Sequence, residues 1–307
     1  MRAAFSDALV DLAKRDPKVL LLTGDHGYAL FDAFRKECPK QYINAGIAEQ
    51  NMVGMAAGLA RLGFKPFVYG LAAFIPVRVV EQIKLDIAHD NLPVVLLGDG
   101  AGFVYSHLGT SHQSTEDIAC TRAIPNLTVL SPADRFEQTL CMHWAYECNG
   151  PVYMRMGKSD RGDVHSAPLN EELGSLLSVR GNGTADIALI ATGSMVKTAL
   201  ELQSTSLPNA SVYSVPSIKP LNTEQLIKVF NQHRLLITLE EHHTDGGLGS
   251  LVCELSSEHL PRKVLRIGVK DRFSEHCGTY QYLLKEHKID LESVREKVLK
   301  FIGDNTP

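Results

Sequence analysis

The stretch INAGIAEQNMVGMAAGLA, residues 43–60, contains a single carboxylate, Glu49, among glycine, alanine and methionine residues. Its pattern predicts a helix with Glu49 in the first turn and with Gly54 and Gly58 on one face. Two interpretations remain open. Glu49 either favours a helix N-terminus whose glycines let another helix pack closely, or it is a carboxyl group that works in an apolar, water-poor site. Burial raises the pKa of a carboxyl group and a helix N-terminus lowers it, so spacing alone does not decide the protonation state.

Two histidines lie in the glycine-bounded segment GDGAGFVYSHLGTSHQSTEDIA, residues 98–119. The segment follows an apolar run, and a helix is expected to begin near Thr115. His107 and His112 could shuttle protons or hydrogen-bond to oxygens, because imidazole titrates near neutral pH. Loop histidines are more often surface or structural groups, so that role also remains open.

Phosphate and metal motifs are incomplete in this sequence. The GDG at residues 98–100 is not followed by GK[ST], is not part of GxGxxG, and is followed by the single Asn126 instead of an asparagine pair. The segment EEHHTDGGLGS, residues 240–250, contains adjacent histidines, which face opposite sides of a strand, and HExxH is absent. We therefore predict a turn and a glycine-rich helix start there, and we expect no metal ligands in this chain.

The elements that position these residues follow an α/β pattern. Short apolar runs typical of strands buried on both faces alternate with helical patterns, and they are VLLLTG, PFVYG, LPVVLLGD, LTVLSP, GPVYMRMG, DIALIATG, ASVYSVPS, RLLITLEEH and KVLRIGV. We expect two doubly wound domains, residues 1–165 and 183–307, joined by a polar, turn-rich linker over 166–182. Parallel sheets bind ligands beyond the carboxyl ends of their strands, where TGDHG, GDGAG, ATGS and EEHHTDGGLG lie.

Composition limits the classes of function. The chain has 307 residues with 31 basic and 35 acidic side chains and no long run of either sign, so a nucleic-acid or anionic-membrane surface is not indicated. No signal peptide and no apolar run long enough to span a membrane are present, which predicts a cytoplasmic protein. The six cysteines form no CxxC pair and are read as buried small hydrophobes.

Five motifs together resemble the C-terminal half of transketolase, and especially the separately encoded C-terminal subunits of split transketolases. They are GIAEQNMVGMAAGLA, GAGFVYSHLGTSHQSTEDIA, RAIPNLTVLSPAD, GPVYMRMGK and EEHHTDGGLGS, and they cover essentially the whole chain in the order of the family. Deoxyxylulose-phosphate synthase and the β subunits of 2-oxoacid dehydrogenases are more distant relatives. The resemblance implies a first domain that binds the aminopyrimidine of thiamine diphosphate and a second that is the transketolase C-terminal domain.

The resemblance assigns cofactor roles to three residues. Glu49 matches the glutamate that contacts N1′ of the aminopyrimidine and favours the tautomer needed for activation of the thiazolium C2. Phe74 falls where the family places an aromatic ring against the pyrimidine, although Val77 and Val80 replace aromatic residues that often follow. Asp25 matches an acidic residue near the thiazolium.

The resemblance also assigns substrate contacts. His112 matches the THQ histidine that faces substrate oxygens, and His107 lies in the same loop. Arg155 and Arg2 match arginines that hold a sugar phosphate.

Two departures put ordinary sugar-phosphate specificity in question. Leu108 stands where the family has an aspartate that reads a donor hydroxyl, and Gly100 replaces a histidine.

The diphosphate and its divalent metal, Mg²⁺ or Ca²⁺, are expected on a separate N-terminal subunit, in a dimer of heterodimers. The resemblance thus predicts transfer of a two-carbon ketol unit from a ketose, phosphorylated in our interpretation, to an aldehyde or another acceptor, within carbohydrate metabolism. Two alternatives are a 2-oxoacid decarboxylating subunit that acylates a lipoyl carrier and a catalytically silent regulatory subunit.

Overall fold

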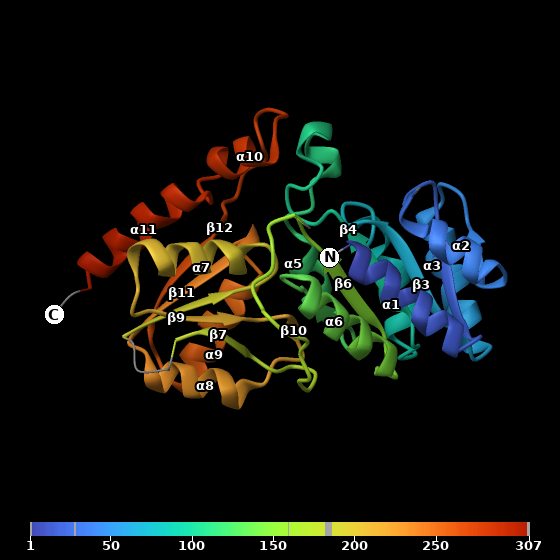
Figure 1. Cartoon of the computed structure of the whole chain (residues 1–307), viewed down its shortest axis with the longest axis horizontal. Helices are drawn as coiled ribbons and strands as arrows, with labels where there is room; N and C mark the ends of the chain where they lie inside the picture. Colours follow the sequence, from blue (N-terminus) through green and yellow to red (C-terminus); the bar gives the residue numbers. More distant parts are fainter. Residues whose placement is uncertain (1, 28, 159, 182–185, 306–307) are drawn as a thin grey trace.

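The computed structural model of the chain describes residues 2–27, 29–158, 160–181 and 186–305. Two α/β bodies lie side by side, an N-terminal one coloured blue to green and a C-terminal one coloured yellow to red (Figure 1). Within the described residues, no helix has the length and apolar character required to cross a membrane. The two doubly wound domains predicted from the alternating pattern are confirmed.

The first domain is built on a seven-stranded sheet with the order β10-β5-β6-β4-β3-β1-β2. Neighbouring strands run parallel except for β10, which is antiparallel to β5. The strands are β1 (Val19–Thr23), β2 (Tyr42–Asn44), β3 (Lys65–Leu71), β4 (Val95–Asp99), β5 (Thr128–Leu130), β6 (Val152–Met156) and β10 (Ser217–Lys219).

Both faces of this sheet are buried because its strands are apolar at consecutive positions. Leu20 and Leu22 of β1 enter one core, and Val19 and Leu21 enter the other. Alternate strand residues point to opposite faces, so such a run needs helices on both sides. Helices α1 (Arg2–Arg15) and α6 (Arg135–Glu147) cover one face, and α3 (Glu49–Arg61), α4 (Val80–Gln82), the π-helical turn η4 (Ile83–Ala88) and α5 (Asp117–Arg122) cover the other. The short helix α2 (Asp32–Glu37) packs beside α1.

The second domain has a five-stranded sheet with the order β12-β11-β8-β9-β7. Its strands are β7 (Leu177–Arg180), β8 (Ile187–Ala191), β9 (Ser211–Ser214), β11 (Leu235–His243) and β12 (Lys263–Val269), with only β7 antiparallel to its neighbour. Helices α7 (Met195–Ser206) and α11 (Leu291–Gly303) cover one face, and α8 (Thr223–Gln232) and α9 (Leu248–His259) cover the other. Helix α10 (Tyr280–Glu286) lies near the loops of the first domain (Figure 1).

The two domains are more closely joined than the sequence pattern suggests. Strand β10 belongs to the second domain by sequence but extends the first sheet. One apolar core also runs across the junction, since it contains Leu22 and Met52 together with Ile190 and Leu236. The segment predicted as linker contains the edge strand β7, which sequence patterning misses because its four residues alternate only weakly in burial.

Helix α3 confirms the prediction that Glu49 lies in a first turn. The glycines on this helix do not pack against a second helix within the chain. Among the described residues outside the helix backbone, no atom lies within 4 Å of a Cβ placed at Gly54 or Gly58. The face of α3 that carries these glycines is therefore open in the isolated chain.

Candidate active site

The carboxyl ends of β4, β3, β1 and β2 are adjacent in the first sheet and bring together loops that are distant in sequence. The Ala45 N–H donates to the Thr23 carbonyl at 2.8 Å, so the chain leaving β2 stays beside the end of β1. A Cβ at Gly24 would lie 2.8 Å from the Gly46 carbonyl oxygen, which shows why glycine is needed at that crossing. The crossing places Asp25 and His26 close to the start of α3.

Glu49 lies at this edge of the sheet, and its side chain is only 8% exposed. Arg78 Nη1 donates to Glu49 Oε2 at 3.0 Å. The same guanidinium stacks over the Phe74 ring, with Cζ 4.0 Å from the ring centroid. The Arg78 guanidinium thus contacts both the Glu49 carboxylate and the face of the Phe74 ring.

Two histidines surround the same phenyl ring. His112 meets Phe74 edge-on with centroids 5.4 Å apart, and His26 lies 5.9 Å from Phe74 in a tilted arrangement. Asp25 is exposed and directly precedes His26 in the chain. The structure therefore brings the predicted residues Glu49, Phe74 and His112 into one cluster, with Asp25 at its margin.

The loop that carries His112 is closed at its base. Gly102 and Ser114 exchange backbone hydrogen bonds of 2.7 and 3.0 Å. Glu241 from the second domain accepts the Phe103 N–H at 2.7 Å and also accepts hydroxyl hydrogen bonds from Tyr280 and Ser194. The buried Glu241 carboxylate therefore fastens the base of the loop to the second domain, while His107 and Leu108 are exposed at its far end.

Arg2 reaches the other side of this loop. It donates to Asp99 at 2.8 Å and to the Tyr105 hydroxyl at 3.0 Å. Burial acts to lower the pKa of Arg2, but Asp99 together with Tyr105 and Tyr69 outweighs burial, so the pKa is raised. A Cβ at Gly100 would lie 2.0 Å from the Tyr105 ring, so the space next to residue 100 is filled by this tyrosine. There is thus no room for a side chain such as histidine at position 100 in this loop conformation.

Arg155 is buried in a separate set of contacts. It is 4% exposed, its Nε donates to Asp117 at 2.8 Å, and Nη2 donates to the Glu241 carbonyl at 3.2 Å. The Tyr153 hydroxyl donates to the same Asp117 oxygen at 2.7 Å. Burial acts to lower the pKa of Arg155, but Asp117 raises it, so the group stays charged. The predicted phosphate contact would require this buried pair to open, and the geometry instead gives Arg155 a structural role.

The EEHH segment is structural, as its sequence predicted. Glu240 accepts the N–H groups of Leu248 and Gly249 at the start of α9. Burial raises the pKa of Glu240 to about 7, and burial lowers the pKa of His242 to about 4. Throughout the described part of the chain, no group of three or more His, Cys, Asp or Glu side chains could hold a metal ion.

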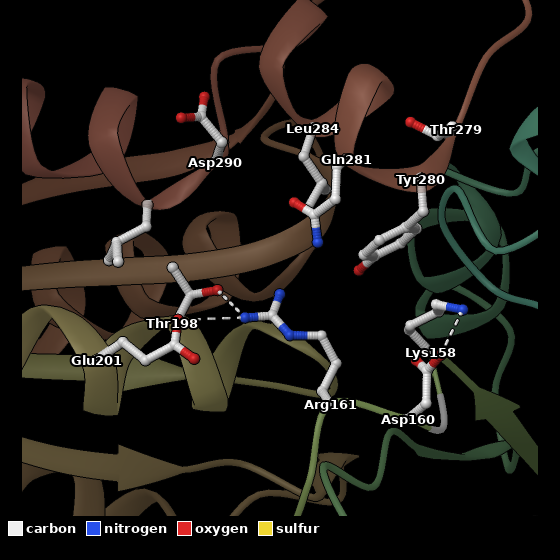
Figure 2. A pocket seen from close by; sticks show the side chains of 11 residues that line it. Lys158, Asp160, Arg161, Thr198, Glu201, Thr279, Tyr280, Gln281, Leu284 and Asp290 are labelled. Carbon is white, nitrogen blue, oxygen red and sulfur yellow. Dashed lines mark hydrogen bonds and ion pairs between the residues drawn. The ribbon is translucent and has the colours of Figure 1, made fainter.

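A separate hollow of about 560 Å³ is lined by the segment that follows β6 and by helices α7 and α10 of the second domain (Figure 2). Arg161 points into it and donates to Thr198 at 3.2 Å and Glu201 at 3.4 Å, with Gln281 and Tyr280 on the facing helix α10. None of the residues predicted for chemistry lines this hollow. The candidate site is therefore the cluster around Phe74.

Comparison with known families assigns both halves of the chain. Residues 1–162 match the transketolase pyrimidine binding domain, and residues 178–294 match the transketolase C-terminal domain. The chain belongs to the transketolase family. It is a pyrimidine-binding, transketolase-like subunit of a thiamine-dependent family of transferases.

Individual relatives of this transketolase subunit have similar length. It is 35% identical to a putative transketolase C-terminal section of Methanocaldococcus jannaschii, with 98% of this chain and 95% of that protein covered. It is 34% identical to an apulose-4-phosphate transketolase subunit of Phocaeicola vulgatus, with 98% and 97% covered. A solved split gene transketolase, an inactive β4 tetramer, superposes with a TM-score of 0.87 at 34% identity and covers 97% of this chain and 96% of its own. The 2-oxoacid dehydrogenase alternative is not favoured by these relatives.

The residues of the transketolase subunit fit the aminopyrimidine part of thiamine diphosphate. A mostly buried carboxylate lies beside an aromatic face, and that combination can hydrogen-bond the edge of a heteroaromatic ring and stack on its surface. Glu49 and Phe74 would hold the ring.

Sequence reasoning missed several residues at or near the site. Arg78 carries a signal that could have found it, since it is the only charged residue between Pro66 and Glu81. His26 directly follows the predicted Asp25. Tyr105 carries no such signal, because its contact with Gly100 depends on the fold of the loop.

Proposed function

We propose that this chain pairs with a separate subunit and transfers a two-carbon ketol unit from a phosphorylated ketose to an aldehyde acceptor. The observation that supports it most is the cluster of Glu49, Phe74 and His112 at the carboxyl ends of parallel strands in a transketolase-family chain. The relative from Phocaeicola vulgatus is named for apulose-4-phosphate, a phosphorylated sugar, and this supports a phosphorylated donor.

The roles of the residues follow from their chemistry. Thiamine diphosphate, when bound, supplies a nucleophilic carbon and an electron sink. Glu49 would hold a proton at the pyrimidine edge, Phe74 would support the ring face, and Asp25 would supply an acidic side chain near the thiazolium. His112 and His107 offer hydrogen bonds to substrate oxygens, and the half-exposed Arg2 offers a cation to the substrate phosphate.

The partner subunit is the second part of the proposal. The diphosphate and a divalent metal, Mg²⁺ or Ca²⁺, would be held by that subunit in a heterotetramer formed as a dimer of heterodimers, in the cytoplasm. The relatives named as a transketolase C-terminal section or as one subunit of a transketolase support a separately encoded partner.

The choice of donor tests the reaction class. The reconstituted complex is incubated separately with pyruvate and with xylulose phosphate, each with an aldehyde acceptor. We expect ketol transfer from the sugar phosphate and no decarboxylation of pyruvate. Release of CO₂ from pyruvate without ketol transfer would instead identify a 2-oxoacid enzyme, and inactivity with every donor would favour a silent regulatory subunit.

Substitution of His112 separates substrate contact from cofactor activation. His112→Ala is expected to lower kcat/KM about 10²-fold or more, because a positioned imidazole that assists the reacting oxygens is lost. Exchange of the cofactor C2 proton should stay near the wild-type rate. Exposed His89, which pairs with Asp90 away from the site, provides the control His89→Ala. Equal loss of proton exchange and kcat/KM in His112→Ala would contradict a substrate-facing role.

Leu108 determines selectivity at one donor hydroxyl in this proposal. The side chain is 47% exposed at the far end of the loop, where an apolar group cannot hydrogen-bond a hydroxyl. Leu108→Asp is expected to raise the preference for ordinary ketose phosphates by about 10- to 150-fold. The measurement is kcat/KM for donors of both hydroxyl configurations. Strict ordinary stereoselectivity in the wild type, unchanged in Leu108→Asp, would show that the loop does not set this choice.

A further inference from the structure

Arg78 makes both contacts that the proposed function assigns to the aminopyrimidine. Its guanidinium stacks on Phe74 at 4.0 Å and donates to Glu49 at 3.0 Å. The residue belongs to the short turn η3 (Val77–Val79) that follows Phe74 in the chain. Four residues of separation let the side chain fold back over the ring.

The guanidinium resembles the aminopyrimidine in the features that this site can recognise. Both groups are planar, both present a face that an aromatic ring can stack against, and both carry N–H donors at the edge. Phe74 and Glu49 offer a face and an acceptor. A group that satisfies both leaves the ring face and the Oε2 atom of Glu49 less available to another planar donor.

We propose that Arg78 is a placeholder for the aminopyrimidine: it occupies Phe74 and Glu49 in the free chain and withdraws when the pyrimidine enters. This inference rests on the proposed function. In the free chain, Arg78 pairs with the mostly buried Glu49 carboxylate, and it is the only ion-pair partner of Glu49 among the described residues.

The geometry allows the withdrawal. The Arg78 side chain is 47% exposed, so its guanidinium can return to water, and its ion pair with Glu49 has only one buried member. A long unbranched side chain needs only rotamer changes to move. The two residues that it leaves, Glu49 and Phe74, keep their backbone positions at the start of α3 and after β3.

Removal of a placeholder should strengthen binding of the group it imitates. Arg78→Met keeps length and apolar contact but removes the cation and its donors. We expect Arg78→Met to bind thiamine about 3- to 30-fold more tightly than the wild type, the combined size of an exposed ion pair and a cation–π contact. Glu49→Gln and Phe74→Ala should bind thiamine more weakly. If Arg78 merely positioned Glu49, its substitution would weaken thiamine binding instead.

The test uses the full-length chain and thiamine, which carries the pyrimidine and needs no diphosphate site. Dissociation constants come from ligand-observed NMR titrations, and the Nε–Hε resonance of Arg78 reports its position over Phe74. In the wild type this resonance should lose its ring-current shift as thiamine saturates the site. The matched control is Arg61→Met, which removes a half-exposed arginine that pairs with Asp90 outside the cluster.

The outcomes separate the inference from the function on which it rests. Weaker or unchanged binding in Arg78→Met, or an Arg78 resonance that keeps its shift at saturation, overturns the placeholder alone. Undetectable thiamine binding by both the wild type and Arg78→Met also overturns it alone, because the proposed function does not require the isolated chain to bind thiamine. Thiamine binding that is unaffected by both Glu49→Gln and Phe74→Ala likewise overturns the placeholder, whereas the proposed function is overturned by a reconstituted complex that transfers no ketol unit from any donor.

Discussion

Replacement of Glu49 with glutamine is expected to slow C2 proton exchange of the bound cofactor by about 10²- to 10⁴-fold in the reconstituted enzyme. Glutamine keeps the shape of the side chain but cannot hold or release the proton at the pyrimidine edge. Activation precedes every later step, so the rate of ketol transfer should fall by a similar factor. Quenched-flow NMR of the cofactor C2 proton measures the first effect directly.

The folded structure should survive this substitution. The partner of Glu49 is the 47% exposed Arg78, and an ion pair with so exposed a member contributes little to stability. The control is Glu224→Gln, since Glu224 is also an acid in the first turn of a helix, α8. If Glu49→Gln affects proton exchange no more than Glu224→Gln does, Glu49 is only a favourable first-turn acid.

Asp117→Asn is expected to destabilise the fold by about 3–5 kcal/mol. Asp117 is completely buried and neutralises Arg155, which is 4% exposed. The substitution leaves a guanidinium charge in a low-dielectric environment and weakens the acceptor of the Tyr153 hydroxyl. Urea denaturation followed by circular dichroism gives the free energy of unfolding.

An exposed ion pair provides the comparison. Glu254→Gln disrupts the ion pair between Glu254 and Arg122, in which the Glu254 side chain is 51% exposed. This substitution should lower the free energy of unfolding by at most about 1 kcal/mol. The double variant Asp117→Leu with Arg155→Met should recover much of the loss, because no buried charge is left unpaired. A cost below about 1 kcal/mol for Asp117→Asn would mean that Arg155 finds water or another anion, as a phosphate-binding residue could.

The sequence predicted the parts of this fold that depend on local pattern. Apolar runs such as LPVVLLGD correspond to strands buried on both faces, and the helix after Ala48 begins at Glu49, as expected. Strand β7 and the antiparallel strand β10 were missed because each is short and at a sheet edge. Edge strands gain their partners from tertiary structure, which leaves little trace in the pattern of a few residues.

Residues of the candidate site could be predicted only where the sequence resembles a known family. Glu49, Phe74 and His112 converge as expected, because the ends of parallel strands lie at one edge of the sheet. Arg155 is instead paired with the buried Asp117, and a sequence motif does not reveal that Asp117 reaches it from another element. The Arg78 contact with Glu49 depends in the same way on the path of the chain after β3.

Reconstitution tests the central claim, that this chain is the pyrimidine-binding half of a two-component thiamine-diphosphate transferase. Ketol transfer from xylulose phosphate is measured with thiamine diphosphate and Mg²⁺ for the chain alone, for the diphosphate-binding subunit alone and for their mixture. Activity is predicted only in the mixture, because the proposed function assigns the two ends of the cofactor to different polypeptides. Efficient turnover by this chain in the absence of any other polypeptide would contradict the account.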